Sequence, residues 1–297
     1  MSLNLLDQKP LVEEFLQRES PRPSAFSFVN IFSWKDFFDF KFHVMDDTLC
    51  AFAHYSLGCF QYLPPLGKKV SPETLQRCFE IMETVNKGNG LSRIENVPQE
   101  QLSLFNPREY DYFKKGDEYC YYREEIALSK GNRFKAKRAS YNHFKKHYRH
   151  DFLPFCPQMT HECEGLYERW AANRRKKYSD DVYRQMLEEN RTVHALLFKF
   201  YKELGLIGRV VTVDGKIEAY TFGFALTRDI FCVLVEIANV DVKGLPVYVF
   251  RQFCDDPEMR PFKFVNGMDG FGMHNVEETK LSFRPHILFP AYVVTRK

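Results

Sequence analysis

The sequence predicts an α+β fold with two tandem domains of similar size, each with a mixed central sheet flanked by helices. The chain has 297 residues, and one hydrophobic core seldom grows beyond about 250–300 residues. Each half shows helices, then a tight hairpin, then alternating strands and helices. Pro154 and Pro157 interrupt the pattern near the middle. We therefore expect domains at residues 1–153 and 154–297.

Composition is that of a globular protein able to bury two cores. Twenty-nine Phe and 16 Tyr supply a large apolar area. The first residues lack a cationic stretch followed by an apolar run, and no segment approaches about 18 consecutive apolar residues. We expect no signal peptide, no stable membrane insertion and a cytoplasmic protein. The eight Cys form no C-x-x-C pair, which is typical of reduced, buried thiols. The oligomeric state stays open.

Local patterns predict the elements of the first half. Asp46-Asp47 joins two alternating segments and predicts a hairpin within 40–63. Ser71 followed by Pro72 predicts the start of a helix that ends near residue 86. The other expected elements are short helices at 10–19, 27–38 and from 98, strands at 91–97 and 119–123, and a long basic helix at 132–149.

Local patterns also predict the elements of the second half. The dipeptide Asp214-Gly215 between alternating segments predicts a hairpin of strands 209–213 and 216–226. Helices are expected at 160–177, 179–189, 191–204, 243–254 and 275–282, and further strands at 231–238, 262–266 and 286–294.

A basic segment without acids is the first candidate site. Lys130, Arg133, Lys137 and Arg138 precede more cations, and no acid interrupts before Asp151. Such a patch attracts phosphate groups. The alternative is a solvated helix face.

No cofactor or metal is predicted. His143 and His147 share a helical face, but Phe144 stands where a zinc protease motif needs Glu. The chain has no Walker A motif and no G-x-G-x-x-G. The segment 241–245 has one glycine and one lysine, a thin version of a coenzyme-binding loop before a helix.

Two charged residues stand out in the second half. Glu236 lies in the otherwise apolar stretch 232–238, where a buried carboxylate is costly unless it is paired or catalytic. The alternative is an outward or edge position. Lys280 follows Glu277 and Glu278, so pairing on a helix surface is the alternative to a site role.

Several segments, taken together and in order, resemble the soluble relatives of the phosphatidylglycerol lysyltransferase C-terminal domain. These segments are Tyr121–Arg138, Glu236–Ala238, Val242–Gly244, Phe264–Asn266 and Thr279–Pro285. The resemblance implies two tandem acyl-CoA N-acyltransferase (GNAT)-like domains, similar to the Fem-type aminoacyltransferases. Members of that family move an aminoacyl group from a charged tRNA to a lipid head group.

The resemblance also implies site residues. Lys130, Arg133, Lys137 and Arg138 match the basic segment of the family, and Glu236, Asn266 and Lys280 match its C-terminal motifs. The sequence departs from the family after Asn266. Met268 and Gly270 stand at positions that are usually acidic, and Asp269 is displaced by one residue. If those acids orient an amine, this protein uses a different acceptor or has lost activity.

We therefore expect a transferase of acyl or aminoacyl groups to an amine or hydroxyl acceptor. Glu236 or Asp269 is the expected deprotonating or orienting group, and Lys280 is expected to stabilise an oxyanion or a phosphate. The basic segment would hold the phosphates of a tRNA or of another phosphate-bearing donor. The alternatives are a non-catalytic nucleotide- or RNA-binding protein with the same fold, and a coenzyme A-dependent N-acyltransferase.

Overall fold

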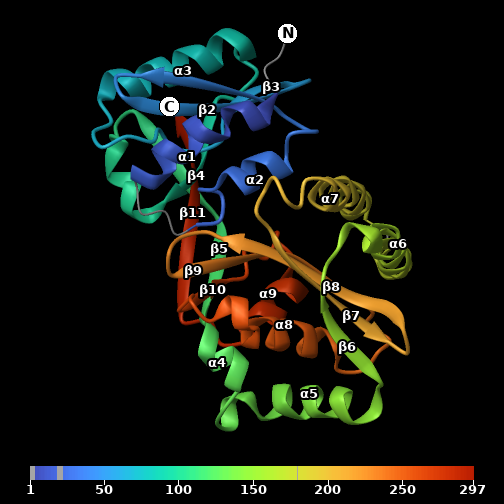
Figure 1. Cartoon of the computed structure of the whole chain (residues 1–297). Coiled ribbons are helices and arrows are strands. Elements are labelled where there is room, and N and C mark those ends of the chain that lie inside the picture. The colour runs from blue at the N-terminus through green and yellow to red at the C-terminus, as the bar shows by residue number, and fades with distance from the viewer. Residues whose placement is uncertain (1–3, 19–22, 179) are drawn as a thin grey trace. The chain divides into compact units, whose positions relative to one another are not determined.

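The computed structural model describes residues 4–18, 23–178 and 180–297 (Figure 1). Its contacts form two compact units. Unit 1 comprises residues 1–119, 268–280 and 287–297, and unit 2 comprises residues 120–267 and 281–286. The chain thus returns to unit 1 twice after residue 119. The domain boundary expected between residues 153 and 154 stays a prediction.

Unit 1 contains a mixed sheet. Its strands are ordered β1 (Asp39–Met45), β2 (Thr48–Tyr55), β3 (Gly58–Gln61), β4 (Arg93–Pro98), β11 (Ile287–Arg296) and β5 (Tyr110–Tyr122), whose last three residues belong to unit 2. Strands β3 and β4 are parallel, and the pairs β1–β2, β2–β3 and β4–β11 are antiparallel. The hairpin turn has φ of 50° at Asp46 and 55° at Asp47, the positive values that a tight hairpin requires.

The helices of unit 1 are η1 (Leu5–Gln8), α1 (Lys9–Arg18), α2 (Phe28–Ser33), α3 (Pro72–Asn86), η2 (Gln99–Leu104) and α9 (His274–Leu281). Ser71 caps α3, because its hydroxyl accepts a hydrogen bond from the Thr74 amide. Helix α3 packs on the sheet through Phe79 and Met82, which are fully buried beside Phe52 of β2. This cluster is the core of unit 1.

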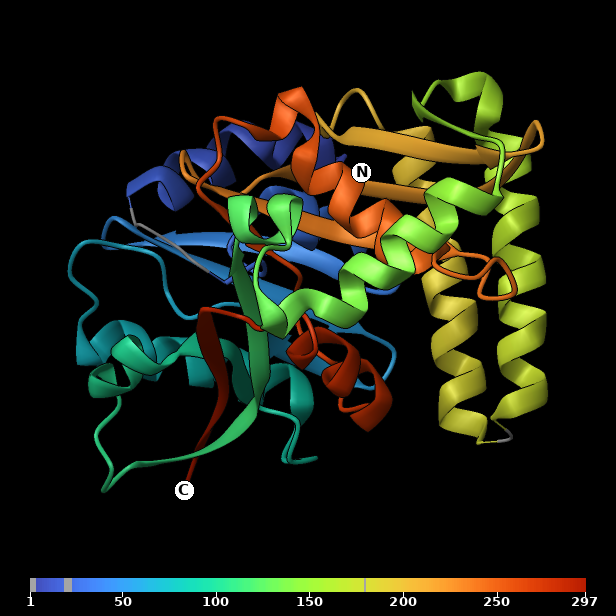
Figure 2. The ribbon, with the colours of Figure 1, turned by 90° about the horizontal axis from the view of Figure 1, so that it is seen from below.

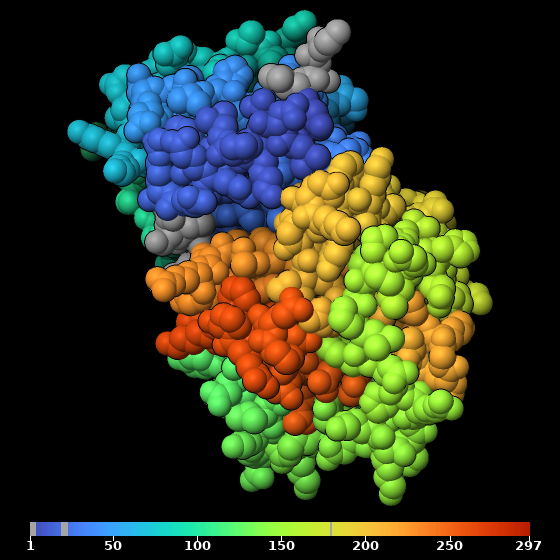
Figure 3. Space-filling view, viewed as in Figure 1, coloured from blue at the N-terminus to red at the C-terminus, as the bar shows by residue number. Residues whose placement is uncertain are grey.

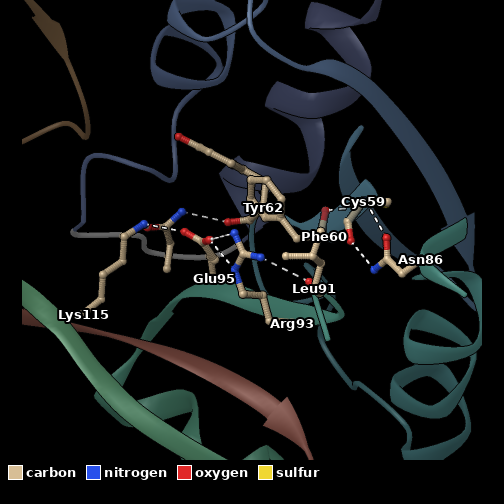
Figure 4. A network of polar contacts seen from close by, with 9 residues as sticks. Cys59, Phe60, Tyr62, Asn86, Leu91, Arg93, Glu95 and Lys115 are labelled. Carbon is tan, nitrogen blue, oxygen red and sulfur yellow. Dashed lines mark hydrogen bonds and ion pairs between the residues drawn. The ribbon is translucent and has the colours of Figure 1, made fainter. Parts of the chain in front are cut away.

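A polar network crosses the sheet of unit 1 (Figure 4). Glu95 accepts from Arg93 at 2.7 Å and from Lys115 at 2.6 Å, and Lys115 also donates to Asn96. Burial alone would raise the pKa of Glu95, but the two cations outweigh it and lower that pKa. Asn96 in turn donates to the carbonyl oxygen of Tyr62. The polar groups of these residues therefore form contacts that link neighbouring segments of unit 1.

Unit 2 contains the other strands and helices. Its strand order is the end of β5, then β10 (Phe264–Asn266), β9 (Ile230–Ala238), β8 (Lys216–Ala225), β7 (Ile207–Val213) and β6 (His150–Pro154). The β9–β10 pair is parallel, and the other pairs are antiparallel. Its helices are α4 (Arg123–Leu128), η3 (Asn132–Phe134), α5 (Lys135–His147), η4 (Pro157–Met159), α6 (Thr160–Lys177), α7 (Asp181–Lys199), α8 (Leu245–Asp255) and η5 (Pro257–Met259).

Helices cover both faces of the unit 2 sheet (Figures 1 and 2). On one face, α5 and α8 pack side by side, and Phe144 and Val249 bury against Ala219 of β8. On the other face, α6 and α7 form a pair, and Phe198 of α7 contacts Phe222 of β8 at 5.4 Å between ring centroids. Alternate residues of each strand therefore meet different helices.

The structure differs from the predicted elements in several places. The helices expected at 179–189 and 191–204 form one helix, α7, and residue 179 lies outside the described residues, as does residue 19 of the first expected helix. Strand β5 is longer than expected and starts at Tyr110. The segment after residue 98 is a 3-10 helix. Strand β6 and helix α4 were not expected.

All eight Cys are free, and all but the half-buried Cys156 are buried.

Candidate functional site

The edge of β9 is the place in unit 2 where two parallel strands separate. Strand β10 pairs with β9 only from Ile230 to Cys232, and it ends at Asn266. Strand β9 continues to Ala238. Beyond Cys232, no described strand of this unit pairs with β9 on that side. Residues 234–236 are half-buried, whereas the residues on both sides of them are buried.

A β-bulge changes the face of the sheet to which the side chains of β9 point along this stretch. Val235 lies opposite Phe222 and Val233 lies opposite Gly223, so Leu234 is an extra residue in β9. Gly223 is required here, because a Cβ atom would lie 2.2 Å from the Cys232 carbonyl oxygen. The bulge reverses the alternation, so residues four apart across it face opposite sides of the sheet.

Glu236 faces α8, in line with two polar residues. The register places Arg209, Thr221 and Glu236 in one row across β7, β8 and β9. Neighbours in such a row share a face. Burial, and then the charge of Glu236, raise the pKa of the Cys254 thiol on α8. Glu236 is therefore a half-buried carboxylate beneath α8.

The two other residues of this row, Arg209 and Thr221, differ in whether their polar groups have partners. Arg209 is buried, and it binds Asp256 through Nε at 2.8 Å and Nη2 at 3.1 Å, and Glu258 at 2.7 Å. Its charge is already compensated. Thr221 is fully buried, and its hydroxyl has no hydrogen-bond partner among the described residues.

Asn266 does not share a face with Glu236. It is fully buried and pairs with Cys232 on β9, on the earlier side of the bulge. Cys232 lies opposite Phe224, which is on the same face as Phe222 and α7. The structure thus separates these two predicted site residues by the sheet itself.

Asp269 and Lys280 belong to unit 1. Asp269 lies in the loop after β10. Burial raises the pKa of Tyr62 and of Tyr119, and the negative charges of nearby acids, Asp269 among them, raise both pKa values further. Lys280 is in the last turn of α9, and its Nζ lies 5.9 Å from the ring centroid of Phe271. The structure therefore places these two candidates in a different unit from Glu236.

The basic segment separates into three roles. Lys130 and Arg133 line a pocket. Arg138 donates through Nη1 to the carbonyl oxygens of Ser129 at 2.6 Å and Gly131 at 2.5 Å, so it holds the loop that presents Lys130.

Lys137 points elsewhere. Its Nζ lies 3.8 Å from the ring centroid of Phe283, and burial lowers its pKa from 10.5 to about 8. A half-buried lysine of this kind is partly neutral near pH 8.

The pocket lined by Lys130 and Arg133 has a volume of about 650 Å³. One wall comes from α4 and the residues up to Phe134, and the other comes from residues 260–263 before β10. The lining residues Arg260 and Lys263 were missed by sequence reasoning. The short basic and aromatic run from Arg260 to Lys263 is the signal that could have found them.

The thin coenzyme-type loop at 241–245 has a packing explanation. Gly244 is the N-cap of α8 with φ of 91°, and a Cβ atom there would lie 2.3 Å from the Ser140 carbonyl oxygen of α5. The glycine therefore lets α8 approach α5.

Within residues 4–18, 23–178 and 180–297, no group of three or more His, Cys, Asp or Glu is arranged to hold a metal ion. In the same ranges, no helix is long and apolar enough to cross a bilayer.

Comparisons with solved structures address the fold. The crystal structure of a conserved protein of unknown function from Bacteroides thetaiotaomicron VPI-5482 has a TM-score of 0.86 at 23% identity, over 100% of this chain and 99% of that chain. L-PGS from Bacillus licheniformis has a TM-score of 0.68 at 16% identity, over 97% and 91%. A tandem GNAT protein from the clavulanic acid biosynthesis pathway has a TM-score of 0.54 at 7% identity, over 98% and 94%. The predicted α+β, tandem GNAT-like fold class is confirmed.

Sequence comparisons address the family. A search of curated proteins finds no match. The family model described as "Phosphatidylglycerol lysyltransferase, C-terminal" matches residues 17–295, nearly the whole chain. The resemblance inferred from the motifs is thereby confirmed, and the chain belongs to the family of phosphatidylglycerol lysyltransferase C-terminal domains.

Proposed function

We propose that this protein transfers an aminoacyl or acyl group to an amine or hydroxyl acceptor. The observation that carries the proposal is Glu236, a half-buried carboxylate on the stretch of β9 that β10 leaves without a partner. Family membership supports the reaction class. A half-buried carboxylate on a strand stretch without a neighbouring strand is a candidate general base, and this supports the proposal.

The proposed reaction assigns each proton and bond. Glu236 accepts a proton from the acceptor amine or hydroxyl, whose lone pair attacks the carbonyl carbon of the donor ester. The carbonyl electrons move to oxygen and form a tetrahedral oxyanion. When this intermediate collapses, the new amide or ester bond remains, and the donor oxygen leaves with the proton that Glu236 had accepted, which restores the carboxylate. Asp269 is the alternative candidate for the base or for orienting the acceptor.

Lys280 and Asn266 keep proposed roles on their match to the family motifs. Lys280 would stabilise the oxyanion or a donor phosphate, because an ammonium is a compact charge with three donors. Asn266 would position the substrate through the end of β10. Its full burial supports a competing role in holding that strand end.

We propose an aminoacyl-tRNA as the donor. The family description names a lysyltransferase, and one similar structure is an L-PGS. The pocket lined by Lys130 and Arg133 offers cations for the phosphates of a nucleic acid.

A transfer assay tests the proposal. Purified protein is incubated with tRNA charged with radiolabelled amino acids and with extracts of lipids and of water-soluble amines. We expect label to move to an acceptor, and Glu236→Gln to slow transfer by at least about 100-fold, the usual contribution of a general base. Glu164→Gln on the exposed surface of α6 is the matched control. Wild-type transfer by the Glu236→Gln protein would contradict the assignment.

The same assay separates the alternatives. A binding protein is favoured by the pocket and predicts nucleotide or RNA binding without transfer from any donor. A coenzyme A-dependent enzyme is suggested by the GNAT-like fold and predicts transfer from acetyl-coenzyme A. The close packing of Gly244 against Ser140 argues against coenzyme A binding at this loop, because it explains the glycine without a ligand.

A further inference from the structure

The cavity of unit 2 joins two segments that are far apart in the sequence. Helix α4 and the loop to Phe134 form one wall, and residues 260–263 form the other. In Figure 3 the orange surface of α8 and the residues that follow it adjoins the green surface of this part of the chain. Contacts between α4 and α8 agree with this placement.

The lining has a surplus of positive charge. Five cationic residues line the cavity: Arg123, Lys130, Arg133, Arg260 and Lys263. The acids in the lining are Glu124 and Glu125, which leaves a surplus of three, equal to the formal charge of the whole chain.

Most of this charge is available to a ligand. Arg133 pairs with Glu125 at 2.6 Å. Lys130, Arg260 and Lys263 are exposed, and no acid among the residues that the structure describes lies within 4.0 Å of them. Three cations therefore converge on the cavity from both walls without an acidic partner.

Arginine–carbonyl hydrogen bonds hold the frame of the cavity rigid. Arg123 extends from α4 to the opposite wall and donates to the carbonyl oxygens of Phe262 at 3.0 Å and Cys254 at 2.9 Å. Arg138 fixes the loop that carries Lys130. Arg251 of α8 donates to the Ala127 carbonyl oxygen at 2.8 Å. A preorganised wall lowers the entropy that a ligand must overcome.

We propose that this cavity binds a phosphate-bearing ligand, with Lys130, Arg260 and Lys263 contacting phosphate oxygens. A single carboxylate brings one charge and two acceptor oxygens, so it compensates three cations less well than a phosphate group does. A phosphate group brings up to about two charges and three acceptor oxygens, and the guanidinium of Arg260 matches its geometry. The volume of about 650 Å³ is within the range of small-ligand pockets. The proposal stands without the transfer chemistry at Glu236.

Binding measurements with two probes test the proposal, because the phosphate can come from a free nucleotide or from RNA. The probes are ADP and a short fluorescent single-stranded RNA. The variant is Arg260→Gln combined with Lys263→Gln, which removes two charges and keeps the backbone bonds of both residues. The control is Lys176→Gln combined with Lys202→Gln, two exposed cations of the same unit outside the lining.

We expect wild type and control to bind at least one probe, and the Arg260/Lys263 variant to bind it at least about tenfold more weakly. With RNA, the salt dependence of log K should also become shallower by about 1.4, at about 0.7 per lost phosphate contact. Loss with ADP identifies a nucleotide, and loss with RNA alone identifies a nucleic acid, and both support the proposal. It fails if neither probe binds wild type, or if the variant and the control bind equally.

The cavity proposal rests on the proposed function in one respect, because the same pocket would hold the phosphates of the donor, but its failure and the failure of the transfer reaction can be distinguished. Glu236→Gln should leave binding of both probes unchanged, because Glu236 does not line the cavity. If a protein binds the probes but transfers no aminoacyl or acyl group, only the proposed reaction is contradicted. If it transfers a group from small donors but binds neither probe, only the proposed cavity is contradicted.

Discussion

Replacing Lys137 with Met should make the protein more stable at neutral pH. The lysine lies on α5 in a half-buried position, with its Nζ 3.8 Å from the centroid of the Phe283 ring. Burial disfavours its charged form and lowers its pKa from 10.5 to about 8. Met keeps the length and the apolar stem of the side chain, so little packing is lost.

The size of the effect follows from the shift and from two corrections. At about 1.36 kcal/mol per pKa unit, a shift from 10.5 to about 8 gives roughly 3 kcal/mol for a fully desolvated charge. Partial exposure of Lys137 reduces this cost. Attraction of the ammonium to the Phe283 ring, about 0.5–2 kcal/mol, offsets a further part. We expect a net gain of about 1 kcal/mol for Lys137→Met.

The gain should depend on pH in a defined direction. Between about pH 8 and 10.5 the unfolded chain binds more protons at Lys137 than the folded chain does. The free energy of unfolding of the wild type therefore rises with pH across this window. Below pH 8 the cost of the charge is fully present, so the advantage of Lys137→Met is largest at pH 7 and disappears near pH 10.5.

Urea unfolding followed by circular dichroism at several pH values measures this difference. Lys135→Met is the matched control, because Lys135 is an exposed lysine on the same helix. We expect its difference from the wild type to be small at every pH. The reasoning is refuted if Lys137→Met lowers stability at pH 7, or if its effect does not change between pH 7 and 10.5.

Two further predictions concern packing in unit 2. Arg209→Met should lower the free energy of unfolding by about 3–5 kcal/mol, because the buried Asp256 loses its partner, and a loss below about 1 kcal/mol in urea unfolding would contradict this. Gly244→Ala should lower the melting temperature more than Gly215→Ala, since both have positive φ but only Gly244 has an atom, the Ser140 carbonyl oxygen, where the Cβ would lie. Equal losses in a thermal scan would refute the packing role.

Local turn and cap chemistry made much of the fold predictable. Asp46-Asp47 and Asp214-Gly215 form the expected hairpin turns with positive φ, and Ser71 caps the expected helix. These signals are read from a few neighbouring residues. By contrast, one continuous helix replaces the two expected between 179 and 204, because Leu187 and Val193 are buried on either side of the predicted break and α7 packs on α6.

The site was harder to predict, because its geometry depends on distant parts of the chain. Glu236 and Asn266 match one family pattern, yet the bulge at Leu234 places them on opposite faces of the sheet. The residues near Leu234 give no sequence signal for the bulge, because the bulge is set by the register between β9 and β8. Arg260 was missed for the same reason: it joins the cavity only when residues 260–263 lie against α4.

The basic segment shows why cations in one sequence motif need separate explanations. Arg138 is explained without a ligand, because its hydrogen bonds to Ser129 and Gly131 fix the loop. Lys137 has no such explanation, since its charge costs stability where it lies. A residue that a fold keeps at a cost is a better functional candidate than one that the fold needs. If Lys137→Met stabilises the protein and also weakens binding of a phosphate-bearing ligand, the lysine is a binding residue; if it stabilises the protein and leaves binding unchanged, Lys130 and its neighbours in the cavity account for the segment.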